Sequence, residues 1–259
     1  MTIPWPRAEF LKAGDGAGGE GATAGMAGTA GSTMVWGHRG ASSAEVQNSP
    51  AAFVRALEFG ATGVELDIRR TADGVLVVHH DADMADGRLI VETEAGDLPE
   101  HVPTLAWVLD LYTNHLVNIE VKSGPAERDY RGDYLVVDLL LGVLAESDPE
   151  SRHIVTSFDE EVLVRIRESG VASSSGLITS DPRVKNDLGR LVDAGHAAVM
   201  LDRRLVDEAV TDDAHQRGLF VGAWTVNDPY DMRRFAELGV DAIMTDVPDV
   251  AVAALSTIE

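Results

Sequence analysis

Hydrophobic and polar positions follow a repeating order along most of the chain. Short apolar runs alternate with longer segments in which apolar residues recur every three or four positions, the spacing of one face of a helix. The short runs predict strands at 34–37, 63–68, 116–121, 153–157, 176–178, 198–201, 219–225 and 242–245. The longer segments predict helices at 49–59, 105–112, 134–145, 160–168, 188–194, 206–216 and 229–238, with 248–256 as the last. This pattern is typical of parallel strands joined by helices.

Eight such units predict a single-domain α/β protein with a closed (β/α)8 TIM barrel. An open, doubly wound sheet is the competing architecture. It is disfavoured because no glycine-rich nucleotide-binding sequence follows any predicted strand.

One additional apolar run, 75–79, does not fit the alternation. It follows the second strand after a short segment that ends in Asp73-Gly74, a dipeptide typical of a two-residue hairpin turn. A turn at these two residues places Asp67 opposite His80. We therefore expect an antiparallel hairpin after the second strand, at the C-terminal mouth of the barrel.

The beginning of the chain has a different composition. Residues 14–32 consist almost entirely of small and polar residues, which cannot bury enough surface to offset the entropy of ordering. We expect residues 1–33 to be a disordered extension rich in Gly and Ala, and residues 34–259 to form the barrel. Met34 is a candidate for the true start. The chain has no apolar run of the length that a membrane helix needs, so we expect a cytoplasmic protein without a stable membrane anchor.

The net charge narrows the choice of partners. With 43 acidic and 21 basic residues the chain carries a formal charge of −22, which disfavours nucleic acid and anionic membranes as partners. The absence of Cys excludes disulfides, thiolate zinc sites and thiol nucleophiles. An anionic substrate therefore has to be met by local Lys or Arg side chains, or by a bound metal. The sequence leaves the oligomeric state open.

Candidate catalytic residues lie at the ends of the predicted strands, where active sites of barrels are built. Glu65 and Asp67 are two positions apart on one strand and share a face, and Glu120 ends the next strand. Carboxylates that converge repel one another unless a cation lies between them, and oxygen ligands favour one divalent ion, Mg²⁺ or Ca²⁺. His38 and His80 can serve as general acid and general base.

Two cations complete this group. Arg39 follows His38 and Lys122 follows Glu120, so both can hold a phosphate group. Metal, cations and a pair of histidines together predict cleavage of a phosphodiester.

Ordered blocks of sequence strengthen this interpretation. They are His38-Arg39-Gly40-Ala41, Gly63 to Asp67, Thr71 to Gly74, His80-Asp81, Pro103-Thr104-Leu105, Asn118 to Lys122, Ser157-Phe158, Trp224 to Asn227, and Gly239-Val240-Asp241 through Thr245-Asp246. In this order they resemble the glycerophosphodiester phosphodiesterase family.

The resemblance implies a barrel of the phosphatidylinositol-phospholipase-C-like group that hydrolyses glycerophosphodiesters to sn-glycerol 3-phosphate and an alcohol. The roles that it implies are acid/base catalysis for His38 and His80, metal binding for Glu65, Asp67 and Glu120, phosphate binding for Arg39 and Lys122, and an aromatic wall against the glycerol for Trp224. The alternatives are a lysophospholipase D-like phosphodiesterase and a non-catalytic protein that binds phosphodiesters.

The chain departs from the family pattern in two places. Gln47 stands where the family usually has Glu, and the stretch between Asp81 and Glu120 is shorter than usual. Outside the family motifs, we expect Arg69 and Arg70 to be charged, solvated side chains of the hairpin, although one of them could face the substrate entrance. Asp241 and Asp246 are expected to be turn and cap residues.

Overall fold

The predicted closed barrel is confirmed by the computed structural model, which describes residues 33–146, 152–171 and 173–256. Its parallel strands are β1 (Met34–His38), β2 (Gly63–Arg70), β4 (Leu116–Val121), β5 (His153–Ser157), β6 (Ser174–Thr179), β7 (Ala198–Asp202), β8 (Phe220–Trp224) and β9 (Ala242–Thr245). Each strand pairs with its neighbours, and β1 pairs with both β2 and β9, which closes the barrel. Apart from Thr33, the extension expected at 1–33 lies outside the described residues.

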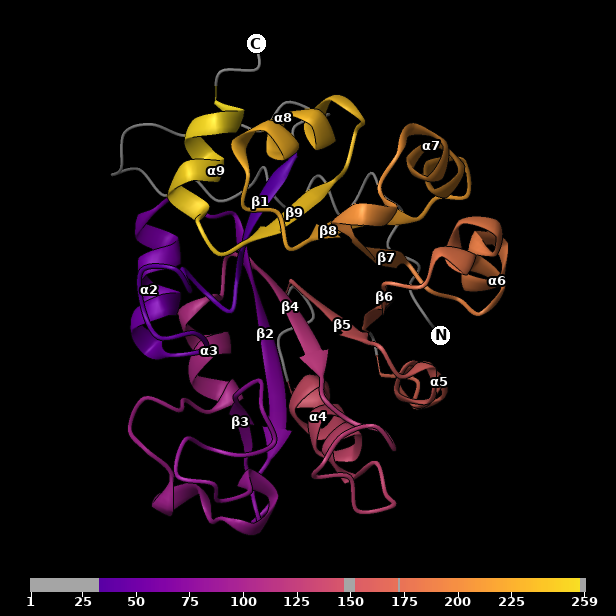
Figure 1. The fold of residues 1–259 in the computed structure, drawn as a ribbon. Helices are drawn as coiled ribbons and strands as arrows, with labels where there is room; N and C mark the ends of the chain where they lie inside the picture. The colour runs from indigo at the N-terminus through magenta and orange to yellow at the C-terminus, as the bar shows by residue number, and fades with distance from the viewer. Residues whose placement is uncertain (1–32, 147–151, 172, 257–259) are drawn as a thin grey trace.

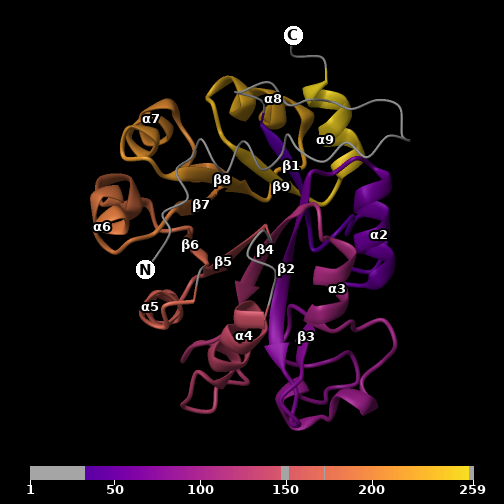
Figure 2. The same ribbon diagram turned by 180° about the vertical axis from the view of Figure 1, so that it is seen from behind.

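Helices surround the barrel, as the ribbon shows from both sides (Figures 1 and 2). They are α2 (Pro50–Glu58), α3 (Leu105–Leu111), α4 (Leu135–Glu146), α5 (Glu160–Glu168), α6 (Leu188–Asp193), α7 (Glu208–Gln216), α8 (Pro229–Glu237) and α9 (Pro248–Leu255). Several begin where a side-chain oxygen accepts a backbone N–H of the first turn, as Ser49 does for α2 and Thr104 for α3. None of the helices in the described part of the chain is sufficiently long and apolar to cross a lipid bilayer.

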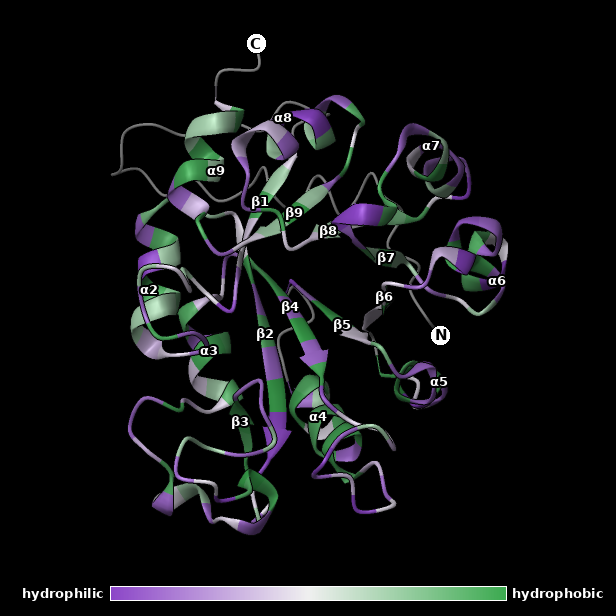
Figure 3. Cartoon of the chain, in the orientation of Figure 1, coloured by the Kyte–Doolittle hydropathy of each residue, from purple (hydrophilic) through white to green (hydrophobic). Residues whose placement is uncertain are grey.

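The interior of the barrel is filled by large apolar side chains. Trp36 stacks on Phe220 with ring centroids 5.6 Å apart, and Met200 and Met244 belong to the same buried cluster. The hydropathy of the strands changes toward the mouth: Figure 3 shows hydrophobic segments along β2 and β4 and hydrophilic residues at their arrowheads. The polar side chains are therefore concentrated where these two strands end.

The hairpin after β2 forms, but its predicted register is wrong by one residue. Strand β3 (Leu76–Val78) pairs antiparallel with β2, and Ile68 lies opposite Val78. The loop is one residue longer than predicted because the hydroxyl of Thr71 accepts the backbone N–H of Val75 at 2.9 Å. Gly74, with φ +80°, takes the left-handed position that a three-residue loop requires.

The connection from β3 to α3 lies beyond the end of β2 (Figure 1). It contains two short 3-10 helices, η2 (Ile90–Glu92) and η3 (Ala95–Asp97). Two further 3-10 helices, η4 (Pro182–Asn186) and η5 (Arg203–Leu205), follow β6 and β7. The site described below is thus bordered by the β3–α3 connection on one side.

Candidate active site

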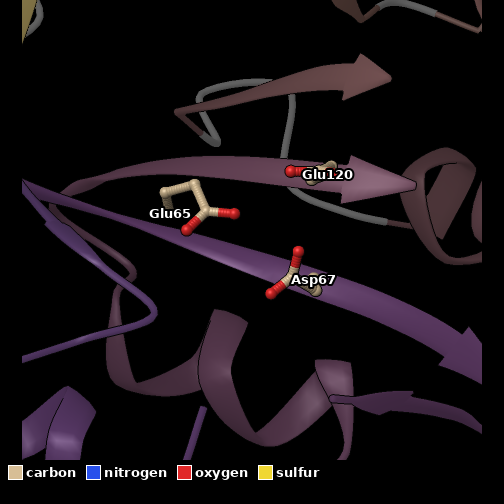
Figure 4. A group of neighbouring side chains, drawn as sticks. All are labelled: Glu65, Asp67 and Glu120. Atoms are coloured by element: carbon tan, nitrogen blue, oxygen red, sulfur yellow. The ribbon is translucent and has the colours of Figure 1, made fainter. Parts of the chain in front are cut away.

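Three buried carboxylates converge between β2 and β4. Asp67 lies directly opposite Glu120 in the strand pairing, and Glu65 shares the face of Asp67 two residues earlier. Each of the three offers one oxygen, and these oxygens all lie within 4.8 Å of one another. Figure 4 shows the three side chains in the same space above the two strands. The sequence prediction of a carboxylate cluster is therefore matched by the geometry.

Burial and mutual repulsion make this group unusual. Burial, together with the charges of Asp67 and Glu120, raises the pKa of Glu65 well above its ordinary value. Burial and the charge of Asp67 raise the pKa of Glu120 to about 7. Burial would also raise the pKa of Asp67, but Lys122 and Arg39 outweigh it and hold that pKa well below the usual range. The group therefore has an affinity for positive charge, whether it comes from protons or from a cation.

Arg39 and Lys122 supply part of that charge. The Nε atom of Arg39 lies 3.1 Å from Oδ2 of Asp67, and Nζ of Lys122 lies 3.1 Å from Oδ1 of Asp67 and also contacts Glu120. Burial would lower the pKa of Lys122, but Asp67 and Glu120 raise it, so the ammonium stays charged. When all three carboxylates are ionised, they and the two cations leave one negative charge. A divalent ion would make the group positive, as binding of a phosphodiester requires.

The carboxylate cluster fits a hard divalent ion. Oε1 of Glu65 is buried and has no hydrogen-bond partner within the described part of the chain, so one oxygen is left for another ligand. The donor atoms are all carboxylate oxygens, the type that Mg²⁺ and Ca²⁺ prefer.

His38 lies at the end of β1, directly opposite Glu65 on β2. Its Nδ1 is 2.6 Å from Oδ1 of Asp246, and its Nε2 is 3.9 Å from Oε2 of Glu65. Ser42 and Asn227 donate to the same Asp246 carboxylate at 2.8 and 2.6 Å. Burial would raise the pKa of Asp246, but the hydrogen bonds from His38 and Asn227 lower it to about 2. An ionised Asp246 therefore holds the His38 ring with Nε2 toward the carboxylates.

His80 follows β3, which pairs with the C-terminal end of β2. The pairing places His79 opposite Asp67, and the N–H of His79 donates to the Asp67 carbonyl at 2.9 Å. The chain then bends at 80–82, and the charge of Asp67 acts on the His80 ring. Burial lowers the pKa of His80, and Asp67 offsets part of this effect. Nδ1 of His80 is 2.8 Å from Oδ1 of Asp81, so the ring is held through Nδ1, as in His38.

The loop after β1 has a tightly constrained backbone. Arg39 and Gly40 have φ values of +58° and +81°, both in the left-handed region. A Cβ atom at Gly40 would lie 2.6 Å from the carbonyl carbon of Ala52, so the start of α2 leaves no room for a side chain. Nη1 of Arg39 donates to Oε1 of Gln47 at 2.8 Å. Gln47 therefore supports Arg39 without adding a fourth carboxylate.

Trp224 ends β8 and borders the mouth. Its Nε1 donates to the Met200 carbonyl at 3.0 Å, and its ring packs edge-on against Phe158 with centroids 5.5 Å apart. Nζ of Lys122 lies 5.8 Å from the centroid of the Phe158 ring. The two rings thus form an aromatic surface that extends from Trp224 to the carboxylate cluster.

The sequence prediction gives no catalytic or binding role to several residues of this site, among them Phe158, Asn48, Asp246 and Arg69. Asn48 donates to Oδ2 of Asp67 at 2.8 Å. The expected cap role of Asp246 is wrong, because α9 begins after Val247 without a side-chain cap and Asp246 binds His38 instead. The expected solvation of Arg69 is also wrong, since this residue is 3% exposed and forms ion pairs. For Arg69 a signal was present, because it shares the strand face of Glu65 and Asp67.

Known proteins resemble this chain along most of its length. The sequence model of the Glycerophosphoryl diester phosphodiesterase family matches residues 38–250, which include every site residue described above. A glycerophosphodiester phosphodiesterase from Caldanaerobacter subterraneus subsp. tengcongensis is 31% identical over 248 residues, covering 85% of this chain and 96% of that protein.

Solved structures share the fold. The glycerophosphodiester phosphodiesterase from Thermotoga maritima has a TM-score of 0.72 and 26% identity, covering 85% of this chain and 97% of that chain. An Oleispira antarctica phosphodiesterase, solved in complex with the product sn-glycerol-3-phosphate, has a TM-score of 0.78 and 22% identity. This match covers 87% of this chain and 98% of that chain.

Proposed function

The chain belongs to the glycerophosphoryl diester phosphodiesterase family, and we propose that it uses His38 and His80 to hydrolyse glycerophosphodiesters to sn-glycerol 3-phosphate and an alcohol. One observation carries the proposal. Two histidines and two cations surround a buried carboxylate cluster at the mouth of the barrel, which is the set of groups that phosphodiester cleavage requires.

Glu65, Asp67 and Glu120 are the residues that would hold a divalent cation. Such an ion, when bound, polarises a phosphoryl oxygen and stabilises the charge that develops on it. Arg39 and Lys122, which contact the two oxygens of Asp67, would bind the remaining oxygens of the phosphate. Mg²⁺ and Ca²⁺ both suit a set of carboxylate oxygens, and the choice between them is left to the experiment.

The histidines transfer the protons. Each has Nδ1 next to an aspartate, Asp246 for His38 and Asp81 for His80, and this leaves Nε2 of each ring for the substrate. One neutral imidazole takes the proton from the attacking glycerol hydroxyl as its oxygen bonds to phosphorus, and the other, as imidazolium, gives a proton to the alkoxide that departs. Water then opens the resulting cyclic phosphate to sn-glycerol 3-phosphate, with the two proton transfers reversed. The carboxylates of Asp246 and Asp81 hold the rings in orientation during this exchange.

The two ends of the substrate can lie on opposite sides of the phosphate. The aromatic surface of Trp224 and Phe158 suits the carbon face of the glycerol. On the side of His80, a cavity of about 590 Å³ is bordered by Met84, Asp86 and Pro99, among others, and it has room for the alcohol.

A panel of substrates and metals tests the proposal. Metal-free enzyme is assayed with glycerophosphocholine and with lysophosphatidylcholine, after addition of Mg²⁺, Ca²⁺ or buffer. Release of sn-glycerol 3-phosphate from glycerophosphocholine, dependent on a cation, is expected. Turnover of lysophosphatidylcholine alone would support the lysophospholipase D-like alternative. Binding without turnover of any diester would support a non-catalytic protein. A cytoplasmic location stays a prediction from the sequence.

A further inference from the structure

Arg69 is a buried, positively charged residue that lies two positions after Asp67 on β2. It follows Glu65 and Asp67 on the same face of β2, and its side chain is 2% exposed. Its guanidinium is surrounded by acceptors from two other segments of the chain. Nη1 donates to Asp129 and Nη2 to Glu127, each at 2.7 Å.

The third acceptor is the backbone carbonyl of His80. Nε of Arg69 donates to this oxygen at 2.9 Å, and Nη2 donates to the same oxygen. Two donors from one rigid guanidinium fix a carbonyl more firmly than a single hydrogen bond can. The peptide plane between His80 and Asp81 is therefore held by Arg69.

Fixing this peptide also fixes the ring of His80. Residues 80–82 form a bend outside the strand ladder, so β3 does not hold them in place. Nδ1 of His80 is oriented by Asp81, whose side chain is itself largely exposed. Because the Asp81 side chain begins directly after the peptide that Arg69 holds, a movement of that peptide would displace both the ring and its partner.

We propose that Arg69 is a positioning residue for His80, and that Glu127 and Asp129 neutralise the charge of its guanidinium. The proposal rests on the proposed function, in which His80 transfers a proton. The hydrogen bonds of Arg69 go to His80, Asp129 and Glu127 rather than to the three carboxylates that would hold the cation. Its loss should therefore lower kcat and leave KM and the affinity for the cation nearly unchanged.

Arg69→Lys is the informative variant. Lysine keeps the positive charge beside Glu127 and Asp129 but cannot donate to the His80 carbonyl with the planar fork of arginine. We expect kcat for glycerophosphocholine to fall about 10- to 100-fold, the range for a misplaced catalytic group. KM, and the Ca²⁺ affinity measured by calorimetry, should change by less than about 3-fold, since Glu65, Asp67 and Glu120 are untouched.

Glu127→Gln is the matched control. It removes one ion pair of Arg69 and leaves the contact with His80 intact, so kcat should stay within about 3-fold of the parent value. If Glu127→Gln and Arg69→Lys lower kcat equally, Arg69 only anchors the loop and the proposal is wrong. If Arg69→Lys does not fold, as judged by circular dichroism and Tm, the charge-balanced pair Arg69→Met/Glu127→Gln takes its place in the same comparison.

A double-mutant cycle with His80→Ala completes the test. If Arg69 acts through His80, the double variant Arg69→Lys/His80→Ala should be no slower than His80→Ala alone. Independent, multiplying losses would overturn the proposal while leaving the role of His80 intact. Parent-level turnover by His80→Ala would instead contradict the proposed function itself, and with it the role of Arg69, so the two failures are distinguishable.

Discussion

Nδ1 of His38 lies 2.6 Å from Oδ1 of Asp246, although 208 positions separate the two residues in the chain. The contact joins the end of the first strand to the residue that follows the last strand, and these two strands pair directly. It gives His38 a fixed ring orientation, with Nε2 toward Glu65. The closure of the barrel therefore places a proton-transfer group beside the carboxylate cluster.

Asp246→Asn should reduce kcat strongly without unfolding the protein. An asparagine can turn an N–H toward Nδ1 of His38, which favours the wrong tautomer, and it no longer stabilises the charged ring. We expect kcat to fall about 100-fold or more, a typical value for a disabled acid–base group. Asp249→Asn, a change at an exposed position on α9, is the control and should keep parent activity. Equal activity of the two variants would contradict the role of Asp246.

His38→Ala and His80→Ala should each lower kcat for glycerophosphocholine by at least about 100-fold, because each removes one proton-transfer group. The barrel should remain folded, since both rings lie at the mouth and outside the apolar clusters. Steady-state kinetics together with Tm checks this prediction. A parent rate in either variant would exclude that histidine from the chemistry.

Removal of divalent cations should abolish activity, and Mg²⁺ or Ca²⁺ should restore it. The raised pKa values of Glu65 and Glu120 mean that protons compete with the cation, so binding should tighten as the pH rises and should release protons. Calorimetry in buffers of different ionisation enthalpy measures this release. Glu65→Gln should weaken cation binding. Full activity in the presence of excess chelator would refute the metal site.

Two buried histidines away from the mouth should make the fold sensitive to acid. Burial lowers the pKa of His153 to about 4, and burial with a smaller effect of Arg167 lowers that of His196 to about 4, from an ordinary value of 6.5. Below pH 6.5 the unfolded chain binds protons that the folded chain does not yet accept. The free energy of unfolding should therefore fall as the pH drops from 6.5 to 4, by up to about 3 kcal/mol for each histidine.

Urea titrations over this pH range check the effect. In His153→Gln/His196→Gln the loss of stability should be smaller than in the parent protein. The difference between the two proteins isolates the histidines, because the raised pKa values of Glu65 and Glu120 act in the opposite sense in both. Parallel curves would contradict the prediction.

Gly40→Ala should destabilise the fold and disturb the active site together. The added Cβ would lie 2.6 Å from the backbone of Ala52, and φ of +81° is unfavourable for alanine. We expect a loss of more than about 2 kcal/mol, with lower kcat because Arg39 and His38 are adjacent. Gly218→Ala is a matched control, since Gly218 also has φ of +81° but has open space around it. Its free energy of unfolding should therefore fall only by the cost of the left-handed backbone, about 1 kcal/mol. Similar losses in both variants would show that the contact with Ala52 is unimportant.

The barrel and the main site residues could be predicted from the sequence because the patterns that indicate them lie within short segments of the chain. Glu65 and Asp67 share a strand face by their spacing alone, and the alternation of strands and helices requires parallel pairing. The register of the hairpin could not be predicted from Asp73-Gly74, because it depends on a hydrogen bond from Val75 to the hydroxyl of Thr71.

The partners of Asp246 and Arg69 depend on contacts between distant segments. Asp246 follows the last strand, and its carboxylate finds His38 only because β9 lies beside β1. Arg69 is adjacent to an ordinary hairpin charge, Arg70, and its burial depends on Glu127 and Asp129 from a loop about 60 positions away. Strand spacing indicates that Arg69 shares the face of Glu65 and Asp67, but it does not identify the distant partners of either residue.

Because β1 pairs with β9, the carboxylate cluster and the pair His38–Asp246 are completed at different points along the chain. Glu65, Asp67 and Glu120 belong to neighbouring strands in the first half of the chain, so the cation site needs no residue beyond Lys122 to bring its ligands together. His38 acquires its partner only when the last strand has docked. During refolding, the ability to hold a cation should therefore precede the ability to hydrolyse a diester.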